Sequence, residues 1–443
     1  MRGSTLAPAA AGVVPPPHVR ERPTVRVAGV LRGALLVLLA GNLVRLPALT
    51  AGAREAPILV NDLAVLTVLL VGALAMATRG RLYVDGAARL ALVFAAVGAV
   101  SAALAVPRFG LTTRELVFSL AYLARWLVYF GLYVVIVNCV TRAEAPRVWA
   151  ALEMMILVFS LFGIVQSAFL PGFAQLVYPD SQLYVDWDPQ GRRLVSSFLD
   201  PNFAGALVCI GLLCAVARLT CGERVAGWRV GVLVTALLLT ASRSSLLATM
   251  AGGAVIALVI GLSRRVVRVL LVLGALTLPA VPALLAFGRA YGKLEIDASA
   301  LSRIVSWLRA LRMLADHWLI GVGFNTYGFA QRAYGFDPGR GAFGFSLDGG
   351  LLFVAVMTGV VGLAFYVGML WRIGRRARAV WRSPAVLPVE RAMAVACVAC
   401  MVALRVHSLF VNSLLSTFIM EPLWILWALP FAALRPEPAG GAS

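Results

Sequence analysis

Lysine is nearly missing from this chain, and charge of any kind is scarce. Lys293 is the one lysine among 39 basic residues, and charged residues make up only 13% of the 443-residue sequence. Hydrophobic residues make up 61%, whereas a soluble domain contains roughly 45–50% apolar residues. So few charges cannot cover the surface of a water-soluble protein. The composition therefore excludes a soluble enzyme and indicates that lipid is the solvent.

Acidic residues are also few. The 20 Asp and Glu residues leave a formal net charge of +19, a balance often found in nucleic-acid-binding proteins. Here the charges are spread over loops between apolar runs, which argues against a nucleic-acid partner. In a membrane protein, excess arginine either sets topology or binds anionic substrates.

Cysteines offer neither a disulfide framework nor a convincing metal site. All six lie in apolar runs or at ends that we expect to face the cytoplasm, where disulfides are rare. The CxxC of Cys397 and Cys400 lies inside AMAVACVACMVAL, so we interpret both as small packing residues. We expect no metal and no cofactor. The remaining cysteines are Cys139, Cys209, Cys214 and Cys221.

Apolar runs long enough to cross about 30 Å of hydrocarbon predict an all-α transmembrane bundle of about twelve spans. The division between the seventh and eighth runs rests on Ser242-Arg243 alone. The first run follows several arginines without a small-residue cleavage site, which favours a signal anchor. The predicted spans are 29–46, 57–77, 88–106, 116–138, 148–170, 199–217, 228–241, 244–262, 267–288, 349–370, 389–408 and 412–434.

Loop charges predict the orientation. With the N-terminus in the cytoplasm, every cytoplasmic loop carries at least two arginines, as the positive-inside rule expects. Both termini are then cytoplasmic, in a bacterial inner membrane. Residues 1–27 and 436–443 are predicted tails, and residues 28–435 form one membrane domain. Its two long periplasmic loops span 171–198 and 289–348.

The second long loop contains an amphipathic helix. In residues 301–316, an apolar arc opposes a polar one at helical spacing. Such a helix lies on the membrane surface or covers the bundle as a lid. Either arrangement places Arg303, Arg309 and Arg312 at the outer interface, where Arg312 and Asp316 have the spacing of a helical pair. The apolar arc comprises Ile304, Trp307, Leu308, Leu311 and Leu314.

Other outer arginines form a candidate phosphate site. Arg192 and Arg193 precede Asp200-Pro201-Asn202, a sequence typical of a helix start, and helix N-termini favour anions. Arg243 lies alone in a tight outer turn, where it has little topological use. Its guanidinium can bind a phosphate bidentately. Ordinary loop arginines remain the alternative.

These pieces, in this order, resemble the O-antigen polymerase and O-antigen ligase superfamily. The resemblance covers roughly residues 115–370, and each motif alone is weak. Its elements here are Arg192/Arg193 with Asp200-Pro201-Asn202, Ser242-Arg243-Ser244, Arg303 to Trp307, Gly321-Val322-Gly323, and Asp348 with Gly359 to Gly362.

The resemblance implies a GT-C-like membrane glycosyltransferase that acts at the outer leaflet. Such proteins transfer an oligosaccharide from undecaprenyl pyrophosphate to an acceptor sugar hydroxyl. The pyrophosphate leaving group needs fixed cations, so Arg192, Arg193 and Arg243 are the expected pyrophosphate ligands. Arg243, Arg303 and Asp348 are the expected catalytic residues.

Asp348 departs from the ligase pattern. Ligases of the family carry His-Asn about eleven residues before the first glycine of G-x-x-G, where this chain has Asp348-Gly349. A carboxylate can orient or deprotonate the acceptor hydroxyl, which favours a polymerase for O-antigen or exopolysaccharide. The alternative role for Asp348 is an N-cap of the following helix. Chain-length regulators or export machinery are the expected protein partners.

Four further features are weaker candidates. His317 follows the amphipathic helix and is expected to be structural, while His407 at the end of a predicted span can reach the cavity. Asp186-Trp187-Asp188 resembles a metal-binding D-x-D, a motif that is common by chance. Arg125 lies within a predicted span, where charges are costly. It either pairs with Glu153 or forms the floor of the cavity.

Other function classes remain open. A ligase that joins glycan to lipid A-core is the enzymatic rival. A lipid-linked sugar flippase or secondary transporter is the rival from another class. Carriers usually show related halves with helices broken at midplane, and this sequence has no clear internal repeat. A structural membrane subunit is the remaining alternative.

Overall fold

The structure of the chain is a computed structural model. It describes residues 27–51, 54–80, 82–179, 192–259, 261–262, 298–336 and 347–432. Nearly all of the predicted N-terminal tail, the whole predicted C-terminal tail, the ninth predicted span and Asp186-Trp187-Asp188 lie outside these residues.

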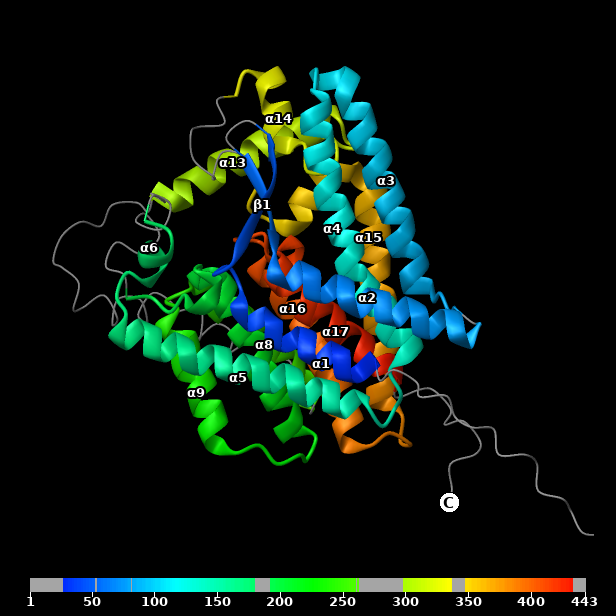
Figure 1. Cartoon of the computed structure of the whole chain (residues 1–443), viewed down its shortest axis with the longest axis vertical. Coiled ribbons are helices and arrows are strands. Elements are labelled where there is room, and N and C mark those ends of the chain that lie inside the picture. Colours follow the sequence, from blue (N-terminus) through cyan, green and yellow to red (C-terminus); the bar gives the residue numbers. More distant parts are fainter. Residues whose placement is uncertain are drawn as a thin grey trace, which may run out of the picture.

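The described residues form a helical bundle with one β-hairpin (Figure 1). Six helices are long and apolar enough to cross a membrane: α2 (Val60–Arg79), α3 (Gly86–Phe109), α4 (Thr113–Cys139), α5 (Ala145–Phe169), α8 (Pro201–Thr220) and α15 (Gly350–Arg382). The others are α1 (Val27–Val37), α6 (Phe173–Val177), α9 (Gly227–Leu239), α10 (Arg243–Val259), α13 (Ala298–Asp316), α14 (Tyr327–Ala330), α16 (Pro388–His407) and α17 (Thr417–Ala432).

Short 3₁₀ helices occur at Leu38–Ala40 (η1), Ser196–Phe198 (η2), Gln331–Tyr334 (η3) and Ser413–Leu415 (η5). The prediction of a helical membrane protein is confirmed. Ten of the twelve predicted spans coincide with described helices and the first does so in part, while twelve crossings and a periplasmic loop stay predictions.

The structure corrects the first predicted span. Helical structure ends at Ala40, and β1 (Arg45–Ala51) pairs antiparallel with β2 (Arg54–Leu59) before α2 begins. The register is irregular between Leu46 and Leu49, where Pro47 supplies no backbone N–H. The hairpin lies along α4, where the Arg114 guanidinium donates to the backbone oxygen of Thr50 at 2.5 Å. The apolar run 29–46 therefore belongs partly to a strand.

Helices α16 and α17 form the centre of the bundle. Helix α17 is buried along its whole length, and α16 packs against α8, α10 and α15. In Figure 1, α1, α2 and α5 cross in front of this pair, while α3, α4 and α15 run together on one side. Cys397 and Cys400 are buried and free in α16, as expected of packing residues. The central helices thus leave little room for anything but side-chain packing.

The predicted division at Ser242-Arg243 is confirmed. Helix α9 ends at Leu239 and α10 begins at Arg243. Ser242 caps the start of α10. Its hydroxyl accepts from the Ser245 backbone N–H at 3.4 Å, and its backbone carbonyl accepts from the Leu246 N–H at 3.1 Å. This turn lies at the same end of the bundle as α13. We call this end the α13 face; it comprises residues 109–113, 192–200, 239–243, 298–336, 347–349 and 407–416.

Helix α15 is broken at Gly359, whose backbone angles are φ 65° and ψ −171°. The segment 318–323 pairs with the opened backbone: the N–H groups of Val360 and Val322 donate to Trp318 and Val356 oxygens at 2.8 Å. A Cβ on Gly359 would lie 2.2 Å from the Leu319 carbonyl group. The glycines of GVG and G-x-x-G therefore permit a loop to lie directly against a helix backbone.

The expected Arg125–Glu153 pair is wrong. Arg125 pairs with Asp62 of α2 at 2.9 Å, and Glu153 pairs with Arg218 of α8 at 2.9 Å. The reason is helix order, since α4 packs against α2 and α17 while α5 packs against α1, α8 and α9. The two charges of the expected pair thus lie on helices that are not direct neighbours.

Candidate functional site at the α13 face

Arg303 and Asp348 form an ion pair. The Arg303 Nε atom lies 3.1 Å from Asp348 Oδ2, and both side chains are about a quarter exposed. Trp307, one helical turn after Arg303, donates its indole N–H to the Asp348 backbone oxygen at 2.7 Å. Burial raises the pKa of the Asp348 carboxyl, and Arg303 opposes this rise. Helix α13 thus holds a carboxylate that is partly open to solvent and inclined to take up a proton.

Asp348 is not the cap of α15. Gly349 occupies the N-cap position with φ 108° and makes no side-chain cap, and the helix begins at Gly350. The capping alternative is therefore wrong. The carboxylate is directed to Arg303, and Gly350 is fixed instead by its N–H, which donates to the Ser408 oxygen at 2.5 Å.

Arg193 fastens the turn that carries Arg243. Its Nε donates to the Thr240 oxygen at 2.9 Å and its Nη2 to the Ala241 oxygen at 3.4 Å, at the C-terminus of α9, where cations are favoured. Arg243 is exposed, between buried serines on both sides. Arg243 is thus the first residue of α10, at the positive end of the helix dipole.

Asp200 is the N-cap of α8 and lies beside this turn. Its Oδ1 accepts from the backbone N–H groups of Asn202 at 2.7 Å and Phe203 at 3.2 Å, which confirms the predicted cap. Burial raises the pKa of Asp200 to about 6; these N–H groups and Arg193 oppose the rise, while Asp348 adds to it. Asp200 thus lies within electrostatic reach of both Arg193 and Asp348.

His407, the last residue of α16, lies beneath the site. It is fully buried, with Nε2 at 3.2 Å from Ser244 Oγ and 3.1 Å from Ser245 Oγ, and Nδ1 at 3.1 Å from Ser413 Oγ. Ser242 Oγ continues the network to Asn202 Oδ1 at 3.0 Å. This connected hydroxyl–imidazole network holds the starts of α8 and α10 against the end of α16.

The sequence did not predict this network, apart from His407 and the serines flanking Arg243. The serine-rich TASRSS sequence was its one local signal. Ser413 and the indole of Trp307 reach their partners from distant elements, so no spacing in the sequence could reveal them.

Backbone strain gathers at the same place. Ser196, Leu199 and Ala241 have positive φ values of 49°, 57° and 49°, a conformation that costs L-residues roughly 1–2 kcal/mol each. They lie in the segments that carry Arg193, Asp200 and Arg243. Strain of this kind often accompanies functional sites, where the surrounding structure enforces it.

Helix α13 combines the two predicted arrangements. Ala310 and Met313 are buried against the bundle, while Leu308 is 62% exposed along with Ile304 and Leu311. Helix α13 therefore covers the bundle and presents an apolar stripe outward, as an interfacial helix does. The polar residues Ser306 and Arg309, expected on the opposite face, are half-buried. Arg309 lies 5.3 Å from the Phe336 ring centre.

The remaining candidates lie apart. His317 packs edge-on against Phe109 at 5.2 Å between ring centres, and burial lowers its pKa. It is fourteen residues from Arg303, or roughly 21 Å along a helix, so it is remote from Asp348. Asp316 accepts from the Tyr334 hydroxyl at 2.9 Å and forms no ion pair with Arg312. The pair predicted from spacing is therefore wrong.

Arg192 is exposed next to Arg193, and its backbone oxygen accepts from Ser167 at 2.6 Å. Arg125 is bound by Asp62 and the Pro57 backbone oxygen. Its guanidinium also lies 5.6 Å from the Tyr122 ring centre. Arg192 therefore stays a candidate ligand at the α13 face, while Arg125 serves to join α4 to α2. Among the described residues, no His, Cys, Asp and Glu side chains group as a metal site would require.

Residues 229–367 match the family model described as O-antigen ligase. The match supports the O-antigen ligase and polymerase superfamily for this part of the chain. No curated protein sequence matches the chain. The matched region contains Arg243, Arg303 and Asp348, together with the glycines that join segment 318–323 to α15. The match supports an enzyme of the membrane that acts on lipid-linked glycans.

Proposed function

We propose that this protein is a glycan polymerase of the bacterial inner membrane. It transfers an oligosaccharide from undecaprenyl pyrophosphate to an acceptor sugar hydroxyl at the periplasmic side, without a metal. The observation that carries the proposal is the convergence of Arg193, the Arg243 turn, Asp200 and the Arg303–Asp348 pair at one face. In this proposal the α13 face is periplasmic. The arginine-rich ends of α8 and α15, at the other face, are cytoplasmic.

In the proposed reaction the acceptor oxygen attacks the anomeric carbon of the donor, with inversion. The bond from that carbon to the pyrophosphate oxygen breaks, and the electron pair leaves with undecaprenyl pyrophosphate. Arg243 and Arg192 neutralise the charge that develops there. The acceptor proton passes to the Asp348 carboxylate, whose raised pKa suits it to a base. Arg303 orients that carboxylate, while Arg193 positions the Arg243 turn.

A ligase that joins glycan to lipid A-core is the second candidate, because the matching family model is described as O-antigen ligase. Asp348 in place of the expected histidine supports the polymerase. Both reactions use the same donor and the same leaving group. They differ in the acceptor alone, so the product distinguishes them.

The test supplies purified protein with its lipid-linked repeat and resolves the products on a gel. A ladder of lengths supports the polymerase, whereas one transfer onto lipid A-core supports the ligase. Asp348→Asn and Arg243→Gln should each reduce product at least roughly 100-fold. Arg224→Gln is the matched control, since it removes an exposed arginine from the opposite face. The proposal would be overturned if the unmodified protein made neither product, or if Arg243→Gln kept full activity.

A further inference from the structure

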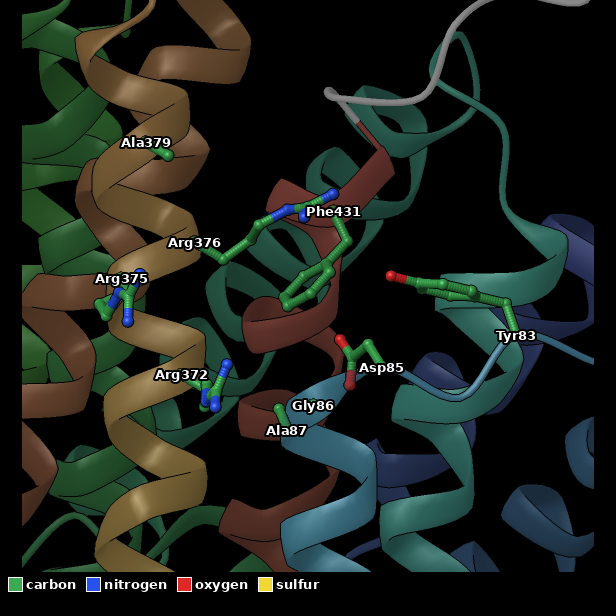
Figure 2. A pocket seen from close by; sticks show the side chains of 9 residues that line it. All are labelled: Tyr83, Asp85, Gly86, Ala87, Arg372, Arg375, Arg376, Ala379 and Phe431. Carbon is green, nitrogen blue, oxygen red and sulfur yellow. The ribbon is translucent and has the colours of Figure 1, made fainter.

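A pocket of about 340 Å³ lies at the end of the bundle opposite the α13 face. Figure 2 shows Arg372 and Arg376 reaching from α15 toward the start of α3 and the end of α17. Arg375 lies on the same helix. The other lining residues are Tyr83, Asp85, Gly86, Ala87, Ala379 and Phe431. Three arginines thus line a space of the size that binds small ligands.

The residues that line this pocket do not neutralise its positive charge. Among the described residues, Arg372, Arg375 and Arg376 form no ion pair. Asp85 is the one acidic residue of the lining, and its two oxygens are engaged by the Ala88 N–H at 2.7 Å and the Tyr133 hydroxyl at 2.7 Å. The pocket therefore carries three guanidinium groups against one carboxylate.

Arg376 packs against Phe431 and has one buried donor without a partner among the described residues. Its guanidinium carbon lies 5.1 Å from the Phe431 ring centre, and its Nε is buried with no hydrogen-bond partner in the described structure. An unpaired buried donor of this kind costs roughly 1–3 kcal/mol. Arg372 lies with its Nη1 3.5 Å from the position of a Cβ on Gly86, at the start of α3. Both guanidinium groups thus border the pocket, one beside Phe431 and the other beside Gly86.

From this geometry we infer that the pocket binds the phosphate group of an anionic ligand. Guanidinium groups bind phosphate oxygens through parallel hydrogen bonds, and the start of α3 adds its dipole. A carboxylate ligand would use one arginine, whereas three arginines suit the several oxygens of a phosphate.

The surroundings favour a phospholipid head group as the source. Trp371, next to Arg372, is 66% exposed, and Leu82, next to Tyr83, is 61% exposed. Exposed apolar and aromatic side chains beside a basic pocket are typical of the level of lipid head groups. A soluble phosphate would not contact these exposed apolar and aromatic side chains.

This site is separate from the proposed transfer site. Helix α3 has 24 residues and runs from the pocket to the α13 face, a distance of roughly 36 Å. None of the pocket residues has a role in the proposed transfer. Binding at the pocket can therefore succeed or fail independently of the activity.

The test uses full-length protein in detergent. Native mass spectrometry measures binding of dioleoylphosphatidylglycerol and, for comparison, of dioleoylphosphatidylcholine. A parallel arm measures stabilisation against heat by inorganic phosphate. We expect the anionic lipid to bind more tightly, and Arg372→Gln with Arg376→Gln to weaken its binding by about tenfold or more for each arginine. Arg378→Gln with Arg382→Gln is the matched control, because both lie on α15 outside the pocket.

Ala379→Trp is a second variant, which fills the pocket and leaves every charge in place. Loss of lipid binding in both pocket variants but not in the control supports the inference with lipid as the source. Stabilisation by inorganic phosphate without lipid preference, lost in the same variants, supports it with a soluble phosphate. Equal loss in pocket and control variants, or no binding of either probe to the unmodified protein, overturns it.

Discussion

Replacing Gly359 with alanine should destabilise the protein severely, because two costs add at this residue. Its φ of 65° with ψ of −171° is a region that only glycine occupies readily, and another residue costs about 1–3 kcal/mol there. The new Cβ would lie 2.2 Å from the Leu319 carbonyl group, so segment 318–323 must move away. That movement breaks at least the bonds from Val360 and Val361 to Trp318 and Leu319, each worth about 1 kcal/mol.

The sum is roughly 3–5 kcal/mol of lost stability. The assay is the apparent unfolding temperature of purified protein, followed by tryptophan fluorescence at one scan rate. Gly374→Ala is the matched control in the same helix, because its nearest neighbour is Met401 Sδ at 3.7 Å. Alanine there should stabilise by about 0.5–1 kcal/mol. If Gly359→Ala unfolds at the same temperature as the unmodified protein, the described break in α15 is wrong.

Three further results are expected. Asp348→Asn and Arg303→Gln should each slow transfer at least roughly 100-fold. The double variant should be little slower than either single variant, because the two residues act as a unit. A double variant whose loss in transfer rate equals the product of the two single losses would contradict this. Burial raises the pKa of Asp200 to about 6 from 3.8, so the folded state holds its proton more tightly. The free energy of unfolding should rise as the pH falls from 6 to 4, and Asp200→Asn should flatten that rise in denaturation curves. Arg193→Gln should lower both the unfolding temperature and activity. Arg192→Gln should lower kcat and leave the unfolding temperature unchanged, because Arg192 acts on the charge that develops in the transition state; identical effects of the two variants would refute the distinction.

Local chemistry made much of the fold predictable. Apolar runs identified the helices, and the polar pair Ser242-Arg243 between two of these runs predicted the break between α9 and α10. The hairpin after Ala40 escaped notice because its strands, Arg45–Ala51 and Arg54–Leu59, lie mostly in the loop expected between the first two spans. Hydrophobicity alone does not distinguish such a strand from a short helix.

The candidate site was predictable in its residues but not in its pairings. Arginine chemistry and motif order singled out Arg243, Arg303 and Asp348. The partners depend on helix order, which sequence spacing does not contain. Hence Arg125 pairs with Asp62, and Asp316 accepts from Tyr334. The His407–Ser413 contact joins the end of one helix to the start of the next, and only the fold brings them together.

The break in α15 has a consequence for exchanging parts between relatives. Trp307 and Arg303 bind Asp348 at the start of α15, and segment 318–323 pairs with that helix around Gly359. Helix α13, this segment and the first nine residues of α15 therefore form one structural unit. A chimera that received α13 alone would contain Arg303 without its matching Asp348, and its segment 318–323 would not match the α15 backbone with which it pairs. Specificity should transfer between such enzymes only when residues 298–361 are moved together.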